Sequence, residues 1–214
     1  MYRLAVILGG ILWSSDALDG AQLIINGGFD SDLSGWATNG LVSPSSGFAL
    51  MEEDPGGGDS ALFQTVGAGD DPLILSFELF VDGMSPNVPD GLLPDTAFGT
   101  VYFGDAAFGP DASAGTFDES LSLFDLDRNG PGALAGSLLL ETIATRPGWV
   151  RMTVPLSTSR SFVTFVVEEV NLNGSIDSAL AIDAVSIEVI PEPSISVLLN
   201  FVLALFVARR TRPT

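Results

Sequence analysis

The central part of the chain alternates apolar and polar residues with a period of two. In Leu73–Asp82 the odd-numbered residues are all apolar, whereas Ser76, Glu78 and Asp82 lie on the opposite face. This is the pattern of a β-strand that is buried on one side only. The same alternation recurs in 149–155, 161–168 and 185–189, and shorter stretches predict strands at 22–25, 48–51, 61–66, 98–103 and 120–124.

Turn-forming residues separate these predicted strands. Gly, Pro, Asp, Asn and Ser cluster in 53–59 and 83–91, and residues 18–190 show no apolar period typical of a helix. Many short alternating strands with turns between them predict an all-β fold, either a β-sandwich or a jelly roll. We assign residues 18–190 to one such domain, which is long enough to bury a sizeable core.

The first 17 residues predict a signal peptide. Arg3 supplies a minimal positive start, and Leu4–Trp13 is an apolar stretch of ten residues. Ser15 and Ala17 are small residues at the positions that a signal peptidase reads, so we place the cut after Ala17. The sequence therefore predicts an exported domain that begins at residue 18.

The last part of the chain holds a second apolar run, which covers residues 194–208 with one strong polar interruption at Asn200. The run is shorter than the roughly 20 residues that usually span a bilayer, so a buried core helix is one interpretation. Three arginines follow the run: Arg209, Arg210 and Arg212. They fit a cytoplasmic stop under the positive-inside rule, which favours a short transmembrane helix.

The same tail carries a sorting motif. Pro191-Glu192-Pro193, the short hydrophobic helix and the terminal arginines, in that order, resemble the PEP-CTERM sorting signal. In that family an exosortase recognises and processes the tail, in Gram-negative bacteria that make exopolysaccharide. The resemblance implies that residues 191–214 are a sorting signal and that the helix anchors the protein transiently in the inner membrane. It also implies a final location in the cell envelope, at the outer surface or outside the cell.

The predicted domain is strongly acidic. The chain has no cysteine, histidine or lysine, and residues 18–190 carry 25 acidic and four basic side chains, a net charge of −21. Such a surface repels phosphate backbones, so nucleic acid is excluded as a partner. The acidity fits either plain solubility or stabilisation by divalent cations outside the cell.

The composition also removes most catalytic chemistries. Ser–His and Cys–His nucleophile systems need residues that the chain lacks, zinc loses its favoured ligands, and no Gly-rich phosphate loop is present. Glycoside hydrolysis by a pair of carboxylates remains an alternative, but no spacing in the sequence singles out two of the acids. We therefore expect a protein that is not an enzyme, with a secreted glycan hydrolase as the remaining catalytic alternative.

The entry to the domain carries a second motif. In Asn26-Gly27-Gly28 glycine permits positive φ, and we expect Phe29 to turn inward and Trp36 to plug the end of the sandwich. This opening and three later segments resemble the galactose-binding-like jelly rolls of many carbohydrate-binding modules: 62–66, 75–77 and 182–185. The resemblance implies the fold, whereas a fold does not fix what its site binds.

One acid of the last predicted strand needs a partner. Strict alternation places Asp183 on the inward face with Val185 and Ile187, so its carboxylate must lie at the rim, accept hydrogen bonds or meet a cation. In the jelly rolls that the chain resembles, the acid of the first loop and that of the last strand help to hold a structural Ca²⁺. The matching residues are Asp30 and Asp183. Hydrogen-bonded rim carboxylates are the alternative, because Ca²⁺ takes about six or more oxygens.

Two aromatic residues are candidate platforms for a sugar ring. Trp149 begins a predicted strand, on the face opposite Val150, and Tyr102 alternates with Val101 and Phe103, so both are candidates for the outer surface. Structural packing is the alternative for each of them. We predict an exported, non-enzymatic protein of the envelope or extracellular matrix, with a structural or adhesive role associated with exopolysaccharide or biofilm. The main alternative is a carbohydrate-binding module that recognises a glycan.

Overall fold

A computed structural model of the protein describes residues 21–53, 58–82, 96–107, 117–127, 130–134, 138–170 and 178–190. The predicted signal peptide and the predicted sorting signal lie outside these ranges, and the ranges hold no helix long and apolar enough to cross a membrane. The described elements are β-strands: β1 (Ala37–Asn39), β2 (Leu41–Pro44), β3 (Ala49–Glu52), β4 (Asp59–Gly67), β5 (Leu73–Asp82), β6 (Thr96–Gly104), β7 (Glu119–Asp127), β8 (Gly130–Leu134), β9 (Leu139–Thr142), β10 (Val150–Leu156), β11 (Phe162–Val170) and β12 (Ala179–Val189).

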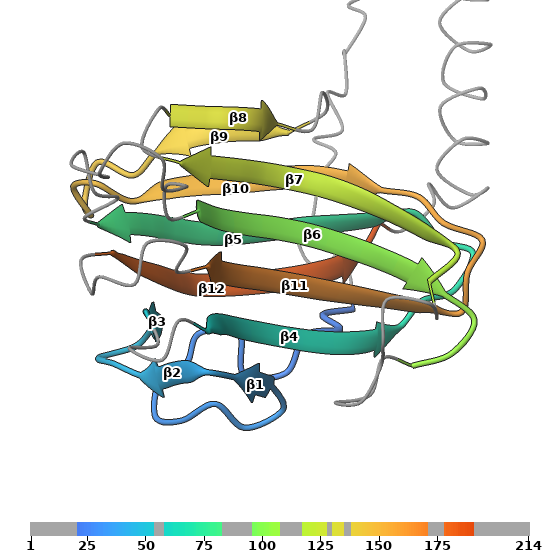
Figure 1. Ribbon diagram of the computed structural model, residues 1–214. Helices are drawn as coiled ribbons and strands as arrows, with labels where there is room; N and C mark the ends of the chain where they lie inside the picture. Colours follow the sequence, from blue (N-terminus) through green and yellow to red (C-terminus); the bar gives the residue numbers. More distant parts are fainter. Residues whose placement is uncertain are drawn as a thin grey trace, which may run out of the picture.

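The strands form two six-stranded antiparallel sheets that pack face to face (Figure 1). The sheet nearer the viewer in Figure 1, the front sheet, has the order β1-β4-β11-β6-β7-β8. The rear sheet has the order β2-β3-β12-β5-β10-β9. This arrangement confirms the predicted all-β sandwich.

The segments with the clearest alternation became the long strands. The predicted strand Leu73–Asp82 coincides with β5, and its odd-numbered residues up to Leu79 are at most 1% exposed. The stretches predicted at 149–155 and 161–168 correspond to β10 and β11, whereas 185–189 is only the second half of β12. At 22–25 the structure has a single β-bridge instead of a strand, between Gln22 and Glu188.

Large apolar side chains from both sheets meet between them. The ring centroid of Phe77, on the rear sheet, lies 5.0 Å from that of Phe165 and 6.1 Å from that of Phe124, both on the front sheet. Phe29 and Trp36 join this core, as predicted, and are 0% and 9% exposed. Each such burial stabilises the fold by about 1.5–3 kcal/mol, so the rings hold the two sheets together.

Residues 21–29 connect the two sheets at one edge. The N–H of Val189, on β12 of the rear sheet, donates to the carbonyl oxygen of Ala21. The side-chain amide of Gln64, on β4 of the front sheet, bonds the N–H and the C=O of Ile25 at 2.7 and 2.9 Å. Because Ala21 and Val189 lie side by side, the described chain enters and leaves the sandwich at the same end.

The first glycine of the entry motif, Gly27, serves close packing rather than a positive φ, which differs from the prediction. Positive φ angles lie at Asn26 (52°) and Phe29 (48°) rather than at the glycines between them. A Cβ atom at Gly27 would lie 1.9 Å from the carbonyl oxygen of Val185. Glycine is required at position 27 because the backbone of β12 passes directly against it.

A β-bulge in β12 changes the predicted face of Asp183. The register with β5 shifts directly after Asp183, and Ala184 at the bulge has a φ of 49°. Ile182 and Val185 both enter the core, at 0% and 3% exposure, because the extra residue resets the alternation. The prediction that Asp183 shares the inward face of Val185 is therefore wrong. Asp183 lies on the outer face of the rear sheet, opposite Glu78 of β5.

Candidate functional site

Charged residues form a row across the outer face of the rear sheet. Arg151 of β10 lies opposite Glu78 of β5, and Glu78 in turn lies opposite Asp183 of β12. On the other side of Arg151, Glu141 of β9 is its direct cross-strand partner. Directly opposed residues on antiparallel strands bring their side chains within reach of one another. We call Asp183, Glu78 and Arg151, together with Arg146 of the β9–β10 turn, the charged row; Glu141 lies just beyond it, on the edge strand β9.

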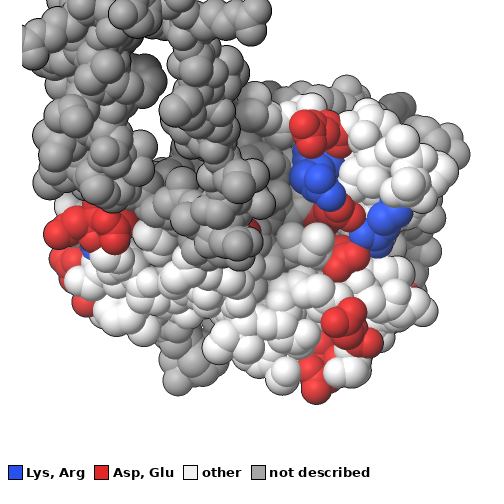
Figure 2. All heavy atoms as spheres, turned by 180° about the vertical axis from the view of Figure 1, so that it is seen from behind, with Lys and Arg blue, Asp and Glu red and all other residues white. Residues whose placement is uncertain are grey.

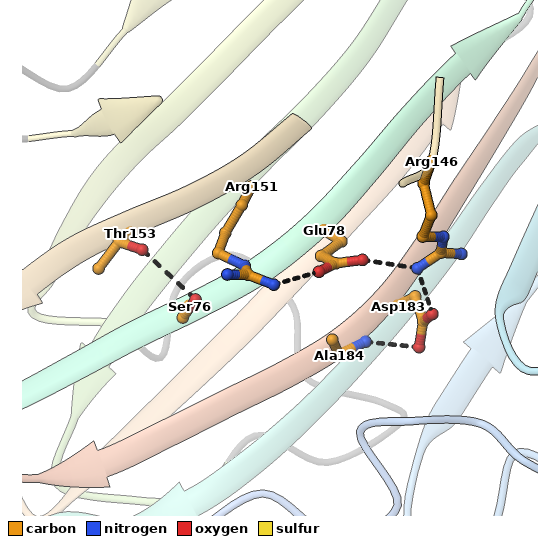
Figure 3. Close-up of polar contacts among 7 residues, drawn as sticks. All are labelled: Ser76, Glu78, Arg146, Arg151, Thr153, Asp183 and Ala184. Atoms are coloured by element: carbon orange, nitrogen blue, oxygen red, sulfur yellow. Dashed lines mark hydrogen bonds and ion pairs between the residues drawn. The ribbon is translucent and has the colours of Figure 1, made fainter. Parts of the chain in front are cut away.

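Two arginines hold the carboxylates of the charged row (Figure 3). The Nη1 atom of Arg146 donates to Glu78 Oε2 and to Asp183 Oδ2, each at 2.6 Å. The Nη2 atom of Arg151 donates to Glu78 Oε1 at 2.6 Å. The Glu78 side chain is only 7% exposed although it lies on an outer face, because the two arginines cover it. Burial of a carboxylate is tolerated when charge-assisted hydrogen bonds of this kind replace water.

The turn between β9 and β10 places Arg146 over the charged row. The N–H of Ile143 donates to the carbonyl oxygen of Trp149 at 3.3 Å, and the N–H of Trp149 donates to that of Arg146 at 3.1 Å. Gly148 has a φ of 85°, and a Cβ atom there would lie 2.7 Å from the ring of Phe80. Glycine therefore lets the turn close tightly against β5.

Aromatic rings adjoin the charged row. The ring centroid of Trp149 lies 5.7 Å from that of Phe80, in a stacked arrangement, and 5.6 Å from that of Phe48, edge-on. The guanidinium carbon of Arg146 lies 3.7 Å from the centre of the Trp149 ring, which is a cation–π contact. Arg146 thus joins these three rings, the aromatic cluster, to the charged row.

The carboxylates of the charged row are acceptors rather than proton donors. Glu78 and Asp183 both contact the same nitrogen of Arg146. Their carboxyl groups are therefore about as close together as the two catalytic carboxyls of retaining glycosidases, which lie roughly 5 Å apart. A glycosidase needs one of its two carboxyls to donate a proton. Here both oxygens of Glu78 accept from arginines, and those of Asp183 accept from Arg146 and from the N–H of Ala184. This arrangement does not fit acid catalysis by the pair, and it is the arginines that keep further N–H donors for a ligand.

The face around the charged row is mixed in character. Seen from behind, basic atoms lie against acidic ones, with uncharged surface and a further group of acidic atoms on the same face (Figure 2). One row further along the strands, the hydroxyl oxygens of Ser76 and Thr153 lie 3.4 Å apart, so the polar surface continues across β5 and β10. This outer face therefore offers charged, hydroxyl and aromatic groups, carried by the strands and by the loops beside them.

No protein-family model matches the chain, and no curated protein matches it. Solved structures of similar fold include the CBM22-1 xylan-binding domain of Xyn10C from Paenibacillus barcinonensis. That match has 11% identity and a TM-score of 0.43, and it covers 83% of this chain and 99% of that one. The K3 cleaved adhesin domain of Lys-gingipain from Porphyromonas gingivalis has 17% identity and a TM-score of 0.44, over 78% and 98% of the two chains. Similarity at this level carries no argument about function.

The two predicted sugar platforms lie on opposite faces of the sandwich. Trp149 is half-buried on the outer side of the rear sheet, with its ring contacted by the side chains described above. Tyr102 belongs to β6 of the front sheet and stacks on Phe117, with ring centroids 4.1 Å apart. Burial raises the pKa of the Tyr102 phenol, and the nearby Glu168 raises it further. The structure therefore does not bring Trp149 and Tyr102 into one site.

The two acids predicted to bind calcium differ in their surroundings. Asp30 is exposed, whereas Asp183 accepts hydrogen bonds from Arg146 and from the N–H of Ala184, each at 2.6 Å. Among the residues that the structure describes, no three acidic side chains are grouped in a way that could hold a metal ion. A calcium site at Asp30 and Asp183 stays a prediction, and an ion there has to share Asp183 with Arg146.

Sequence reasoning missed Arg146, Arg151 and Glu78 as site residues. Alternation placed Glu78 and Arg151 on the polar faces of their own strands, but it could not show that β5 and β10 are neighbours. One signal was available. Two of the four arginines of the predicted domain lie in the single stretch 146–151, which marks it in a chain so poor in basic residues.

A second polar cluster also escaped sequence reasoning. The hydroxyl oxygen of Ser178, just before β12, lies 2.5 Å from Glu53 Oε1 and 3.0 Å from Glu169 Oε1. Both glutamates are buried, at 0% and 1% exposure. Glu53 follows β3 of the rear sheet and Glu169 belongs to β11 of the front sheet, so the cluster ties the two sheets together.

Proposed function

We propose that the protein is an exported, non-catalytic β-sandwich that adheres to a glycan at the cell surface or in the extracellular matrix. Its tail is a PEP-CTERM signal that an exosortase processes, after transient anchoring in the inner membrane of a Gram-negative bacterium. The order of the proline motif, apolar run and arginines in 191–214 supports this route. The fold is of the galactose-binding-like jelly-roll type, which the two-sheet architecture and the Asn26–Asp30 opening support.

The observation that carries the binding role is the joined charged row and aromatic cluster. A guanidinium has five N–H donors, and the bonds from Arg146 to the described carboxylates use only Nη1. Arg146 is 31% exposed and Arg151 46%, so donors fixed by ion pairs reach the surface. Groups that are already held in place lose little entropy when a sugar hydroxyl binds, which favours affinity. Exopolysaccharide of the producing cell is the glycan that this role implies.

A structural role without a glycan is the second candidate. The ring of Trp149 contacts Phe48, Phe80 and Arg146, which is how an aromatic residue that anchors a turn behaves. In that case the cluster fastens the β9–β10 turn to the sheet, and the domain contributes to a matrix by packing alone. Binding measurements separate the two candidates.

A glycan array with the full chain in mild detergent tests the proposal. We expect binding in the micromolar range, weakened about tenfold or more by Arg151→Met, because each lost charge-assisted hydrogen bond costs about 1.5–3 kcal/mol. Arg160→Met is the matched control, since Arg160 pairs with Asp105, Asp118 and Glu119 away from the charged row. Equal binding by both variants removes the charged row as the binding site, whereas no binding of any glycan removes the adhesive role and leaves the structural one.

Mass spectrometry of the extracellular protein tests the sorting route. We expect a form that begins near residue 18 and ends between Ile190 and Ser194, because the described fold engages the backbone as far as the bond from Ile190 N–H to Pro72 O. Recovery of a form that retains Arg209–Arg212 outside the cell contradicts processing of the tail.

The calcium site is a separate proposal, motivated by the resemblance of Asp30 and Asp183 to ion-binding acids. Calorimetric titration of the full chain with Ca²⁺ is expected to release heat that Asp183→Asn abolishes. Hard carboxylate oxygens at both positions are what the ion needs. Absence of heat and of any rise in melting temperature eliminates the site.

A further inference from the structure

The positive charges of the described domain are already neutralised. Arg146 contacts Glu78 and Asp183, Arg151 contacts Glu78, and the third described arginine, Arg160, lies within 3.5 Å of three acids. The whole predicted domain has only one further basic residue, against 25 acids. A ligand that approaches the charged row therefore meets no unpaired cation among the described residues.

An anionic polysaccharide is disfavoured at this face for a local reason as well. A uronate or sulfate group can pair with Arg146 or Arg151 only by drawing it away from Glu78. Glu78 is 7% exposed, so a lost partner leaves a buried carboxylate without compensation. That exchange costs more than a surface ion pair returns, because burial raises the penalty of an unpaired charge while solvent weakens the new contact.

Exposed acids flank the same face. Glu141 lies opposite Arg151 at the β9 edge, and Glu52 lies on β3, beside the end of β12. Both are exposed, and neither forms an ion pair within the described residues. In β3 the buried positions alternate, so Glu52 projects from the outer face of the rear sheet as Leu50 does. Exposed carboxylates that form no ion pair among the described residues therefore lie on two sides of the charged row and the aromatic cluster.

We propose that this face selects its glycan by charge and prefers one that bears protonated amino groups. The inference rests on the proposed adhesive role and adds the ligand class. Amino groups pair with Glu52 and Glu141 at the margins, while sugar hydroxyls bond the outward donors of Arg146 and Arg151. The net charge of −21 adds long-range attraction for such a polycation and repulsion for acidic polysaccharides.

A matched pair of probes tests the inference on the full chain. One probe is a glucosamine oligomer and the other is the fully N-acetylated oligomer of the same length, so that only charge and acetylation differ. At low salt we expect the amino form to bind at least tenfold tighter, and an oligogalacturonate not to bind. In about 1 M salt, where the Debye length falls to about 3 Å, the preference for the amino form is expected to shrink severalfold.

Site-specific attraction is separated from general polyelectrolyte attraction by two double variants. Glu52→Gln with Glu141→Gln is expected to remove most of the preference for the amino form and to leave binding of the N-acetylated form unchanged. Asp70→Asn with Asp71→Asn, an equal change of charge at two exposed acids between β4 and β5, is expected to have little effect.

The outcomes separate the charge selection from the adhesive role. Equal binding of both oligomers at every salt concentration overturns the charge selection and leaves the adhesive role standing. Equal loss in the two double variants also overturns it, because the attraction is then a property of the whole surface. If no probe or array glycan binds, the adhesive role itself fails, and the charge selection with it.

Discussion

Gly99 of β6 lies directly opposite Phe124 of β7, and the ring of Phe124 fills the space that a side chain at position 99 would need. A Cβ atom at Gly99 would lie 2.2 Å from Cε1 of that ring. Phe124 is 0% exposed and packs against Phe77 of the other sheet, so it cannot move aside freely. We expect Gly99→Ala to lower the free energy of unfolding by about 1–3 kcal/mol, as overpacking of a core does. Urea unfolding measures the change.

The control for this prediction is Gly69→Ala. Gly69 lies in the turn between β4 and β5, and a Cβ atom there would meet nothing within 4 Å. We expect it to be neutral or to stabilise the fold by about 0.4–1 kcal/mol, because alanine restricts the unfolded chain. A loss at position 69 as large as that at position 99 would show that contact with Phe124 is not the cause.

The bulge at Ala184 gives the second prediction. A non-glycine residue with a φ of 49° is strained by roughly 1–2 kcal/mol, and Ala184 is exposed, so substitution there changes little packing. We expect Ala184→Gly to stabilise the protein by up to about 1 kcal/mol after the entropy of glycine is counted. Ala184→Val is expected to act in the opposite direction, since β-branched residues fit this conformation worst. Thermal unfolding of the pair checks the sign, and destabilisation by both variants argues against strain at the bulge.

The third prediction concerns the coupling between Arg146 and Asp183. We expect Arg146→Met to cost about 1–3 kcal/mol, because it removes one partner of the buried Glu78 and the side-chain partner of Asp183. Asp183→Asn is expected to cost less, and a double-mutant cycle to show a coupling energy of about 0.5–3 kcal/mol. Arg160→Met is expected to have a smaller effect than Arg146→Met, because the acids around Arg160 are 44–61% exposed. Additive single variants would contradict direct contact between Arg146 and Asp183.

The fourth prediction is a pH dependence at Glu168. Burial on β11 raises the pKa of this carboxyl above its ordinary value of 4.5, and the nearby Asp59 raises it further. The folded state therefore binds this proton more tightly than the unfolded state. The contribution of Glu168 to stability is fully present below pH 4.5 and is lost as pH rises through the folded pKa. Glu168→Gln keeps the neutral form at every pH. We expect it to be more stable than the parent at pH 7 and equal to it in acid, as measured by unfolding at a series of pH values.

Periodicity located the buried strands because burial on one face leaves a strong imprint. In β5 the apolar residues Leu73, Leu75, Phe77 and Leu79 recur at every second position and all enter the core. The edge strands escaped prediction for the same reason. All four residues of β9 are exposed, including Leu139 and Leu140, so position in the sheet and not composition makes them a strand.

The candidate site was harder to predict because it depends on which strands are neighbours. The sequence places Glu78, Arg151 and Asp183 far apart, and only the order β12-β5-β10 brings them into one row. The bulge at Ala184 added an error of one position, which moved Asp183 to the wrong face. Period-two reasoning has no means of detecting one inserted residue, since the residues on either side of it still alternate.

The end at which β12 stops has a mechanical consequence. Val189 lies opposite Leu73 at one end of the rear sheet, whereas Ala181 lies opposite Phe80, beside the aromatic cluster, roughly 20–25 Å away along the strands. A pull between a tail beyond Val189 and a polymer held at the cluster would run parallel to β12. Because β12 is flanked by β3 and β5, its ladder of hydrogen bonds would then be loaded in shear, all rungs together. A domain attached in this way resists tension well, because many hydrogen bonds of β12 must break together. A force that pulled the strand away from the sheet would break them one at a time.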